Sequence, residues 1–342
     1  MSEKNTYSEK LKEITDKLEQ GIQDLFDSEK YTSYLKTMAK FHNYSFRNTL
    51  LIVMQNPQAS YVAGYGAWQT KFKRQVRKGE KGIKIFAPAP YKKTVEEKTF
   101  DKDGNAHIEE KEIIVPAFKL TTVFDISQTE GEDLPMLGTD RLVGNVSDYG
   151  KFFETLKNIS PVPIFFEDIQ GGANGYYHQI EKRIAIQENM SEVQTVKTAV
   201  HEIAHAKLHA IPENKDEAVK IDRRTREVQA ESVAYTVCQH FGIDTSDYSF
   251  GYIAGWSSGR ETEELKQSLE VIRNTAAEFI DAIEEKLLDR EIEQAKETSQ
   301  KEKPTQKTSE KSEKKQSVRK QLAEDKEKKT KKSTKNKEDI SL

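Results

Sequence analysis

The sequence predicts an α+β fold built from two domains and a charged C-terminal tail. Three observations indicate this class: helical spacing alternates with short β-rich runs, a polar linker separates two such segments, and the end of the chain is almost devoid of apolar residues. A chain of 342 residues is long enough for this arrangement. We place the domains at 1–131 and 147–290, with a linker at 132–146 and a disordered Lys- and Glu-rich tail at 291–342.

Composition limits the environment in which this chain is expected. Charged residues make up 32% and hydrophobic ones 35%, and no run approaches the roughly eighteen apolar residues of a membrane span. The first residues, "MSEKNTYSEKLKEI", lack the apolar core of a secretory signal. Cys238 is the only cysteine, which excludes a disulfide framework. We therefore expect a cytoplasmic protein with no membrane partner.

Charge is strongly segregated along the chain. Residues 31–93 contain twelve basic side chains and one acidic side chain, a net charge of +11. Residues 1–30 carry −3 and residues 291–342 carry +5, so residues 94–290 carry −16. The overall net charge of −3 thus conceals a basic module followed by an acidic one. A basic module of this kind favours an anionic partner.

The first domain is expected to begin with helices and continue with strands. Apolar residues recur every three or four positions over 7–27, and further helices are predicted at 31–41 and through "SFRNTLLIVMQ", which stops at Asn56-Pro57. "GAWQTKF" is typical of a short helix. The runs "RQVRKGEKGIKIFAP" and "KEIIVPAFKLTTVFDI" predict strands around glycine turns. Between them we expect a solvated hairpin whose turn is Asp103-Gly104-Asn105.

The second domain is expected to alternate strands and helices. A helix at about 148–158 precedes the strand "VPIFFEDI", a "GGANG" turn and a second strand, "YYHQIEKRIAI". Long helices follow at about 191–210 and 215–241. A further amphipathic helix is predicted at 262–289.

The segment "TAVHEIAHAKLHA", residues 198–210, carries the pattern HExxH on the first long helix. His201 and His205 are four residues apart, so their side chains project side by side, about 5–6 Å apart at Cβ. This spacing lets both imidazoles reach one zinc ion at about 2.0–2.1 Å. Glu202 lies beside the ion, where it can accept a proton from an activated water. The pattern predicts a zinc site with Glu202 as catalytic base.

A third protein ligand is required, and the next helix offers one. His209 lies two turns from His201, about 12 Å along the helix axis, which is too far to share the ion. Glu227 and Glu231 are four apart on a helix rich in apolar residues. We assign Glu227 as the ligand and Glu231 as the acceptor for a histidine ring N–H, with the reverse assignment left open. An oxyanion donor is also needed, and the candidates are Tyr235, His209, Tyr177 and His178.

The basic module combines its charge with eleven aromatic residues. Basic side chains bind phosphates and exposed aromatic rings stack on unpaired bases, so the combination favours single-stranded nucleic acid over duplex. "KGEKGIK" lacks the Gly-Lys-Ser/Thr of a phosphate-binding loop and is more typical of a basic hairpin tip. The candidate contacts are Tyr44, Phe46, Arg47, Asn48, Trp68, Lys71, Lys73, Arg74, Arg77, Lys78, Lys81 and Lys84.

The HExxH region resembles the gluzincin peptidases, especially the compact ImmA/IrrE type. The matching residues are His201, Glu202, His205 and Glu227. This resemblance implies a zinc-dependent peptidase in which the strand "YYHQIEKRIAI" is the edge that an extended substrate peptide joins.

The N-terminal part resembles the ArdC-type antirestriction proteins, whose relatives on conjugative elements include LtrC-like proteins. The motifs are "YSFRNTLLIVMQNP", "VAGYGAWQ", "VRKGEKGIKIFAP" and "VFDISQTEG", in that order. The resemblance covers about residues 5–290 and implies a single-stranded DNA-binding domain joined to a zinc-peptidase-like domain. It further implies protection or handling of transferred DNA. The acidic segment at about 94–112 and the continuation "HAKLH" depart from the family pattern.

The sequence thus predicts a protein of a mobile element with three partners: Zn²⁺, single-stranded DNA and an unknown protein or peptide substrate. Two alternatives stay open at this point. In the first, the protein only binds single-stranded DNA and its zinc site is structural or inactive. In the second, it is a regulatory metalloprotease that cleaves a repressor, and the basic module serves to localise it.

Overall fold

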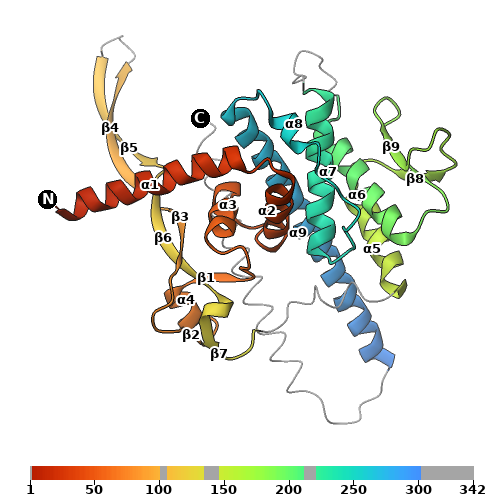
Figure 1. The fold of residues 1–342 in the computed structure, drawn as a ribbon, viewed down its shortest axis with the longest axis horizontal. Helices are drawn as coiled ribbons and strands as arrows, with labels where there is room; N and C mark the ends of the chain where they lie inside the picture. The colour runs from red at the N-terminus through yellow and green to blue at the C-terminus, as the bar shows by residue number, and fades with distance from the viewer. Residues whose placement is uncertain (1, 101–105, 135–145, 212–220, 302–342) are drawn as a thin grey trace. The chain divides into compact units, whose positions relative to one another are not determined.

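The computed structural model describes residues 2–100, 106–134, 146–211 and 221–301. It confirms the predicted α+β class. The chain divides into two compact units, Met1–Leu288 and Asp289–Leu342, and the description below concerns the first unless stated. Figure 1 shows the order of its helices and strands. Among the described residues, no helix is both long enough and apolar enough to cross a membrane.

Three helices open the chain: α1 (Ser2–Asp24), α2 (Ser28–Lys40) and α3 (Phe46–Gln55). The Asp27 carboxylate caps α2 by accepting from two backbone N–H groups, and the Ser45 hydroxyl caps α3 in the same way. Helix α3 ends at Gln55, before the Asn56-Pro57 stop that the sequence contains. All three helices agree with the helical spacing.

The strands that follow form small antiparallel sheets. Strands β1 (Val62–Gly64), β6 (Phe118–Asp125) and β3 (Ile83–Pro88) form one sheet in the order β1-β6-β3. The short helix α4 (Tyr65–Thr70) follows β1, while β2 (Arg74–Val76) pairs with β7 (Thr129–Gly131) after the short 3-10 turn Ile126–Gln128. Strands β4 (Tyr91–Phe100) and β5 (Ala106–Val115) form the long hairpin that was expected, whose turn at 103–105 lies outside the described residues.

The second half of the unit combines one sheet with long helices. Helix α5 (Val146–Ile159) leads into β8 (Ile164–Glu167), β9 (Gly175–His178) and β10 (Arg183–Gln187), in the sheet order β8-β10-β9. Strand β10 is parallel to β8 and antiparallel to β9. The helices that follow are α6 (Glu192–Leu208), α7 (Arg223–His240), α8 (Ile253–Ser257) and α9 (Thr262–Lys301).

Two sequence predictions for this half were wrong in detail. "YYHQIEKRIAI" is not one strand but the hairpin of β9 and β10, because the polar centre turns at Lys182, whose φ is +47°. Helix α9 continues to Lys301, so residues 291–301 of the expected disordered tail are helical. Their glutamate, glutamine, lysine and alanine residues have high intrinsic helix propensity. Residues 302–342, and most of the expected linker at 132–146, lie outside the described residues.

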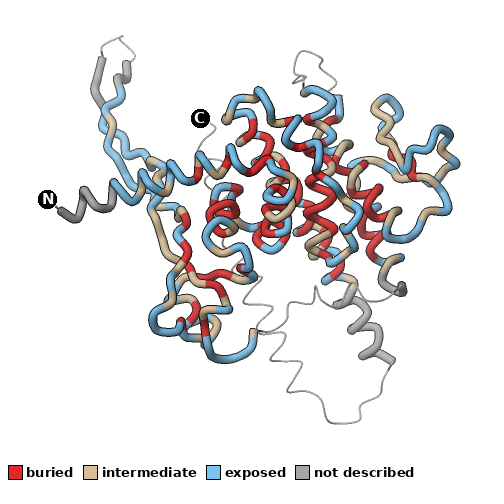
Figure 2. The backbone as a smooth tube through the Cα atoms, viewed as in Figure 1, coloured by how far each residue is buried: buried red, intermediate tan, exposed pale blue. Residues whose placement is uncertain are grey.

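The main hydrophobic core joins the N-terminal helices to the second half of the unit. Tyr31 of α2 is fully buried, and its hydroxyl lies 2.8 Å from the Ser232 Oγ of α7. In the same core, Phe26 contacts Trp256 edge to face, and Tyr31 contacts Phe250 in the same way. Figure 2 shows buried segments running through α2, α6 and α7. Helices predicted to belong to the basic domain therefore pack directly on the helix that carries Glu227 and Glu231.

Candidate metal centre and nucleic-acid surface

Helix α6 has a defined beginning and end that place its histidines on one face. The Ser191 hydroxyl accepts from the Gln194 N–H at 3.2 Å, and the backbone N–H of His209 closes the helix on the His205 carbonyl. Val196, Val200 and Ile203 bury the opposite side of the helix. Packing of α6 therefore fixes the backbone from which His201 and His205 project.

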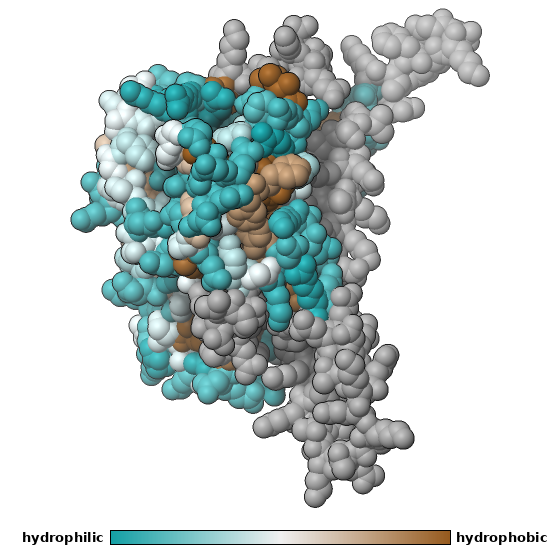
Figure 3. Space-filling view, turned by 90° about the vertical axis from the view of Figure 1, so that its right-hand side faces the viewer, coloured by the Kyte–Doolittle hydropathy of each residue, from teal (hydrophilic) through white to brown (hydrophobic). Residues whose placement is uncertain are grey.

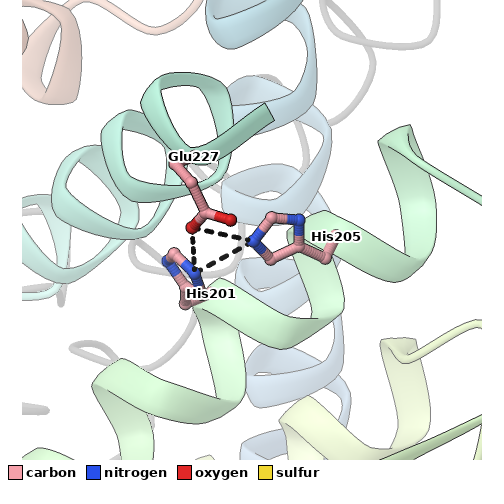
Figure 4. A group of neighbouring side chains, drawn as sticks. All are labelled: His201, His205 and Glu227. Carbon is pink, nitrogen blue, oxygen red and sulfur yellow. Dashed lines mark hydrogen bonds and ion pairs between the residues drawn. The ribbon is translucent and has the colours of Figure 1, made fainter. Parts of the chain in front are cut away.

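Three side chains converge on one point between α6 and α7, as Figure 4 shows. The Nε2 atoms of His201 and His205 are 3.0 Å apart, and Glu227 Oε2 lies 3.7 Å and 3.5 Å from them. Ligand atoms around a tetrahedral zinc ion are separated by about 3.3 Å, given bonds of about 2.0–2.1 Å. This arrangement matches the ligand set predicted from the sequence and fits a divalent metal ion.

Electrostatics at this point favour a cation. The two histidines hold the pKa of Glu227 well below its usual range. Burial alone would lower the pKa of His201, but the neighbouring carboxylates, Glu227 and Glu202 among them, outweigh burial and raise it. The Glu227 side chain is 48% exposed, so the centre is accessible from the surface. An open coordination position is what a catalytic metal site requires.

His209 bonds to a metal-binding histidine without approaching the metal position. Its Nδ1 lies 2.9 Å from His205 Nδ1, and its Nε2 lies 3.0 Å from Gln229 Oε1. The amide oxygen of Gln229 only accepts, so the His209 proton is on Nε2 and its Nδ1 accepts from His205. Burial lowers the pKa of His209 to about 4, which keeps the ring neutral. His205 therefore carries its proton on Nδ1 and presents a bare Nε2 to the metal position.

Glu202, the predicted base, is buried beside β9. It is 7% exposed, and burial raises its pKa, while the Tyr177 backbone N–H donates to its carboxylate. A Cβ on Gly175 would lie 2.6 Å from the Thr198 methyl and 2.9 Å from the Ala185 carbonyl, so only glycine lets β9 approach α6 this closely. A carboxylate with a raised pKa is suited to exchanging protons near neutral pH.

The other predicted residues of this centre have different surroundings. Glu231 receives a hydrogen bond of 2.5 Å from the Tyr252 hydroxyl and bonds to neither metal-binding histidine in the described contacts. Tyr235 is 2% exposed and packs on Tyr248 and Phe250, away from the three converging atoms. Both ring nitrogens of His209 are occupied, which argues against an oxyanion role. Sequence reasoning missed Tyr252 and Gln229, for which no local pattern exists.

The structure corrects three of the predicted DNA contacts in the basic module. Trp68 is completely buried, and its indole N–H donates to the Phe124 carbonyl, so it cannot stack on a base. Phe46 is buried in the core. Asn48 is buried and exchanges two hydrogen bonds with the backbone of Phe86. These residues stabilise the domain, and an aromatic surplus alone does not separate core rings from exposed ones.

Most of the predicted cations do lie on the surface. Arg74 is half-buried, and its guanidinium donates to the carbonyls of Thr129, Gly131 and Glu132. Arg77 is exposed, but its guanidinium also donates to the Ser127 and Thr129 carbonyls and pairs with Glu80. Tyr44 is half-buried. The exposed basic residues of the predicted set are Arg47, Lys71, Lys73, Arg77, Lys78, Lys81 and Lys84.

A groove of about 720 Å³ lies between α1, α3, β3 and β6. Lys10, Lys17 and Lys84 line it together with the apolar side chains of Met54 and Leu120. Sequence reasoning placed Lys84 in the basic module but missed the two lysines of α1. Figure 3 views another face, on which hydrophilic surface is broken by a few apolar areas.

Family models match both halves of the chain. The N-terminal domain of anti-restriction factor ArdC matches residues 4–124, and the IrrE N-terminal-like domain matches residues 159–280. The protein is thus an ArdC-type N-terminal domain followed by an IrrE-like domain of the metallopeptidase class. This pair of domains, in this order, is the one expected of the ArdC-like proteins.

Individual proteins and solved structures also resemble this chain. An uncharacterized Bacillus anthracis protein is 33% identical over an alignment of 338 residues. This alignment covers 87% of this chain. The chain spans 56% of the length of that relative. The metal-free crystal structure of the antirestriction protein ArdC from plasmid R388 is 20% identical, with a TM-score of 0.42, and covers 71% of this chain and 85% of that one. The Mn(II)-bound structure of the same protein is 19% identical, with a TM-score of 0.46, and the match covers 80% of this chain and 97% of that one.

Proposed function

We propose that the second half of this protein is a zinc-dependent peptidase. The observation that carries this proposal is the convergence of His201, His205 and Glu227 beside a buried carboxylate, Glu202. A zinc ion bound by the three residues would supply a Lewis acid that polarises a peptide carbonyl and acidifies water. Glu202 would take the proton from that water on its carboxylate and pass it to the leaving amine.

The substrate would bind as an added strand. Strand β9 is at one edge of its sheet, and the Tyr177 backbone N–H of that strand reaches Glu202. An extended peptide laid along β9 would therefore pass the base and the metal position together. Tyr252, whose hydroxyl contacts Glu231, is 41% exposed and is a further candidate to donate a hydrogen bond to the developing oxyanion.

The test separates metal binding from hydrolysis. The full chain is incubated with a peptide mixture of known composition, and new N-termini are identified by mass spectrometry. Glu202→Gln should keep the metal and lose the cleavages, whereas His201→Ala should lose both. Cleavage that persists in Glu202→Gln would remove Glu202 as the base. Metal bound without any cleavage would favour the alternative of a structural or inactive zinc site.

We further propose that the basic module binds single-stranded DNA in an antirestriction role, protecting DNA as it enters a cell. The groove between α1, α3, β3 and β6 supports this, because it combines an apolar floor on which bases could lie with three lysines, of which Lys17 pairs with the lining Glu13. The exposed rings of Tyr65 and Tyr91, with 54% and 53% of their surface accessible, are additional stacking candidates in this domain.

Binding to labelled single strands tests this second proposal. Affinity should fall with salt, with a log–log slope of about −0.7 for each phosphate contacted. Lys84→Ala should reduce both the affinity and the slope, while Lys157→Ala in α5 removes one charge elsewhere and should change neither. Equal or tighter binding to duplex DNA would count against stacking in the groove.

A further inference from the structure

A second cluster of metal-binding side chains lies well separated in sequence from the HExxH centre. It brings together His42 from the loop after α2, His240 at the end of α7, and Asp281 and Glu284 from α9. The His240 Nε2 lies 3.0 Å from Glu284 Oε1, and the His42 Nε2 lies 3.5 Å from Asp281 Oδ1. The two imidazole rings contact edge to face with centroids 4.9 Å apart. The ligand atoms of His42, Asp281 and Glu284 all lie within 4.8 Å of one another, and His240 reaches this group through Glu284.

The hydrogen bonds of His240 leave one contact that a neutral ring cannot make. Its Nδ1 lies 2.7 Å from the Ala39 carbonyl, which only accepts, so the ring proton is on Nδ1. The bare Nε2 then faces the Glu284 carboxylate, which also only accepts. Either a second proton or a cation must lie between these two atoms. An imidazole whose other N–H donates to a backbone carbonyl is typical of a metal ligand.

His42 supplies an independent observation. Its side chain is 9% exposed, and its Nδ1 is buried without a hydrogen-bond partner among the described residues. A buried polar atom left in this state costs free energy, so its retention calls for an explanation. Asn43 Nδ2 donates to the other ring nitrogen, Nε2, at 3.0 Å, so the ring proton is on Nδ1 and a bare Nε2 faces the Asp281 carboxylate.

We propose that His42, His240, Asp281 and Glu284 bind a second divalent transition-metal ion, of the zinc type, with a structural role. Imidazole nitrogens and carboxylate oxygens both bind zinc, and the charge of the two carboxylates matches that of the ion. The His42 and His240 side chains are 9% and 11% exposed, which suits a site that holds segments together rather than one that admits a substrate. The ion would connect the α2–α3 loop to α7 and α9.

Metal stoichiometry tests the proposal. The untagged full chain is stripped with a chelator, reloaded with Zn²⁺ and dialysed, and bound zinc is then measured per chain. We expect two ions in the natural protein and one in the double variant Asp281→Asn, Glu284→Gln. These amide substitutions keep the shape of the side chains. The neighbouring Glu285→Gln, on the exposed side of α9, is the matched control and should retain both ions.

A second measurement separates this site from the HExxH centre. The variant His201→Ala, His205→Ala should still bind one ion, and Zn²⁺ should still raise its melting temperature. If that variant binds no zinc, or if Asp281→Asn, Glu284→Gln binds as many ions as the natural protein, the second site does not exist. In that case a second proton on His240 occupies the position. A third outcome is possible, in which the natural protein binds one ion and only Asp281→Asn, Glu284→Gln loses it. The HExxH centre would then be empty, so this result would support the second site and overturn the peptidase proposal.

Discussion

Replacing His209 with leucine should weaken metal binding although His209 never touches the metal. The substitution removes the acceptor of the His205 Nδ1–H, which lies 2.9 Å from His209 Nδ1. His205 is then free to carry its proton on Nε2, the atom that must be bare to bind a metal. The buried Gln229, whose amide accepts from His209, loses a partner as well.

The size of the effect follows from this lost contact. A buried donor left without an acceptor costs about 1–3 kcal/mol. Loss of a partner that orients a metal-binding histidine typically costs about 10–100-fold in metal affinity. At about 1.4 kcal/mol for each tenfold, the second range corresponds to about 1.4–2.7 kcal/mol and lies within the first. We therefore expect the zinc dissociation constant of His209→Leu to rise by about 10–100-fold.

Competition with a chelator of known affinity measures this change. His209→Gln, whose amide oxygen can accept the same proton, should recover part of the affinity. His178→Leu is the matched control, because His178 is a half-exposed histidine of β9 that bonds to the Glu181 backbone and not to His205. A His209→Leu protein that binds zinc within twofold of the natural chain would refute the reasoning.

Three further predictions concern other parts of the unit. Asp222→Ala removes the cap of α7 and should cost about 0.5–2 kcal/mol in urea unfolding. Burial would raise the pKa of Asp222, but Thr225 and Arg260 lower it from 3.8 to about 2, so this stabilisation exists above pH 3.8 and should vanish as the pH falls through 2. Gly175→Ala should slow peptide cleavage, because the added Cβ would displace β9 from α6, and it should leave the amount of bound zinc unchanged. An unchanged cleavage rate would mean that β9 does not position Glu202. Trp68→Phe, which leaves the Phe124 carbonyl unpaired, should lower the melting temperature without altering DNA affinity per folded molecule, and weaker DNA binding would restore Trp68 as a contact.

The convergence of His201, His205 and Glu227 was predictable from sequence because its geometry is local. Helical spacing alone puts His201 and His205 on one face, and a second amphipathic helix with Glu227 at the right distance along the chain completes the set. The same spacing also relates His205 to His209, a signal that could have indicated their hydrogen bond. The exclusion of His209 as a ligand rests on its separation from His201 along the helix axis, which this hydrogen bond does not change.

Features that depend on long-range packing could not be predicted. The buried face of α2 has the spacing of any amphipathic helix, so the sequence does not indicate that α2 packs on α7. A tryptophan ring can stack on a base or fill a hydrophobic core, and only the fold shows that Trp68 lies in the core. The cluster around His42 joins residues from three distant segments, none of which carries a recognisable motif.

The contact between Tyr31 and Ser232 bears on how this protein can be divided. Because α2 packs on α7, a fragment that begins at residue 147 would expose the apolar face of the helix that carries Glu227. A fragment that ends at residue 131 would expose the matching face of α2. The two halves share one cooperative folding unit, and losing either half removes part of the other's interior. We therefore expect the two sequence domains to unfold together, and both proposed functions should be tested on the intact chain.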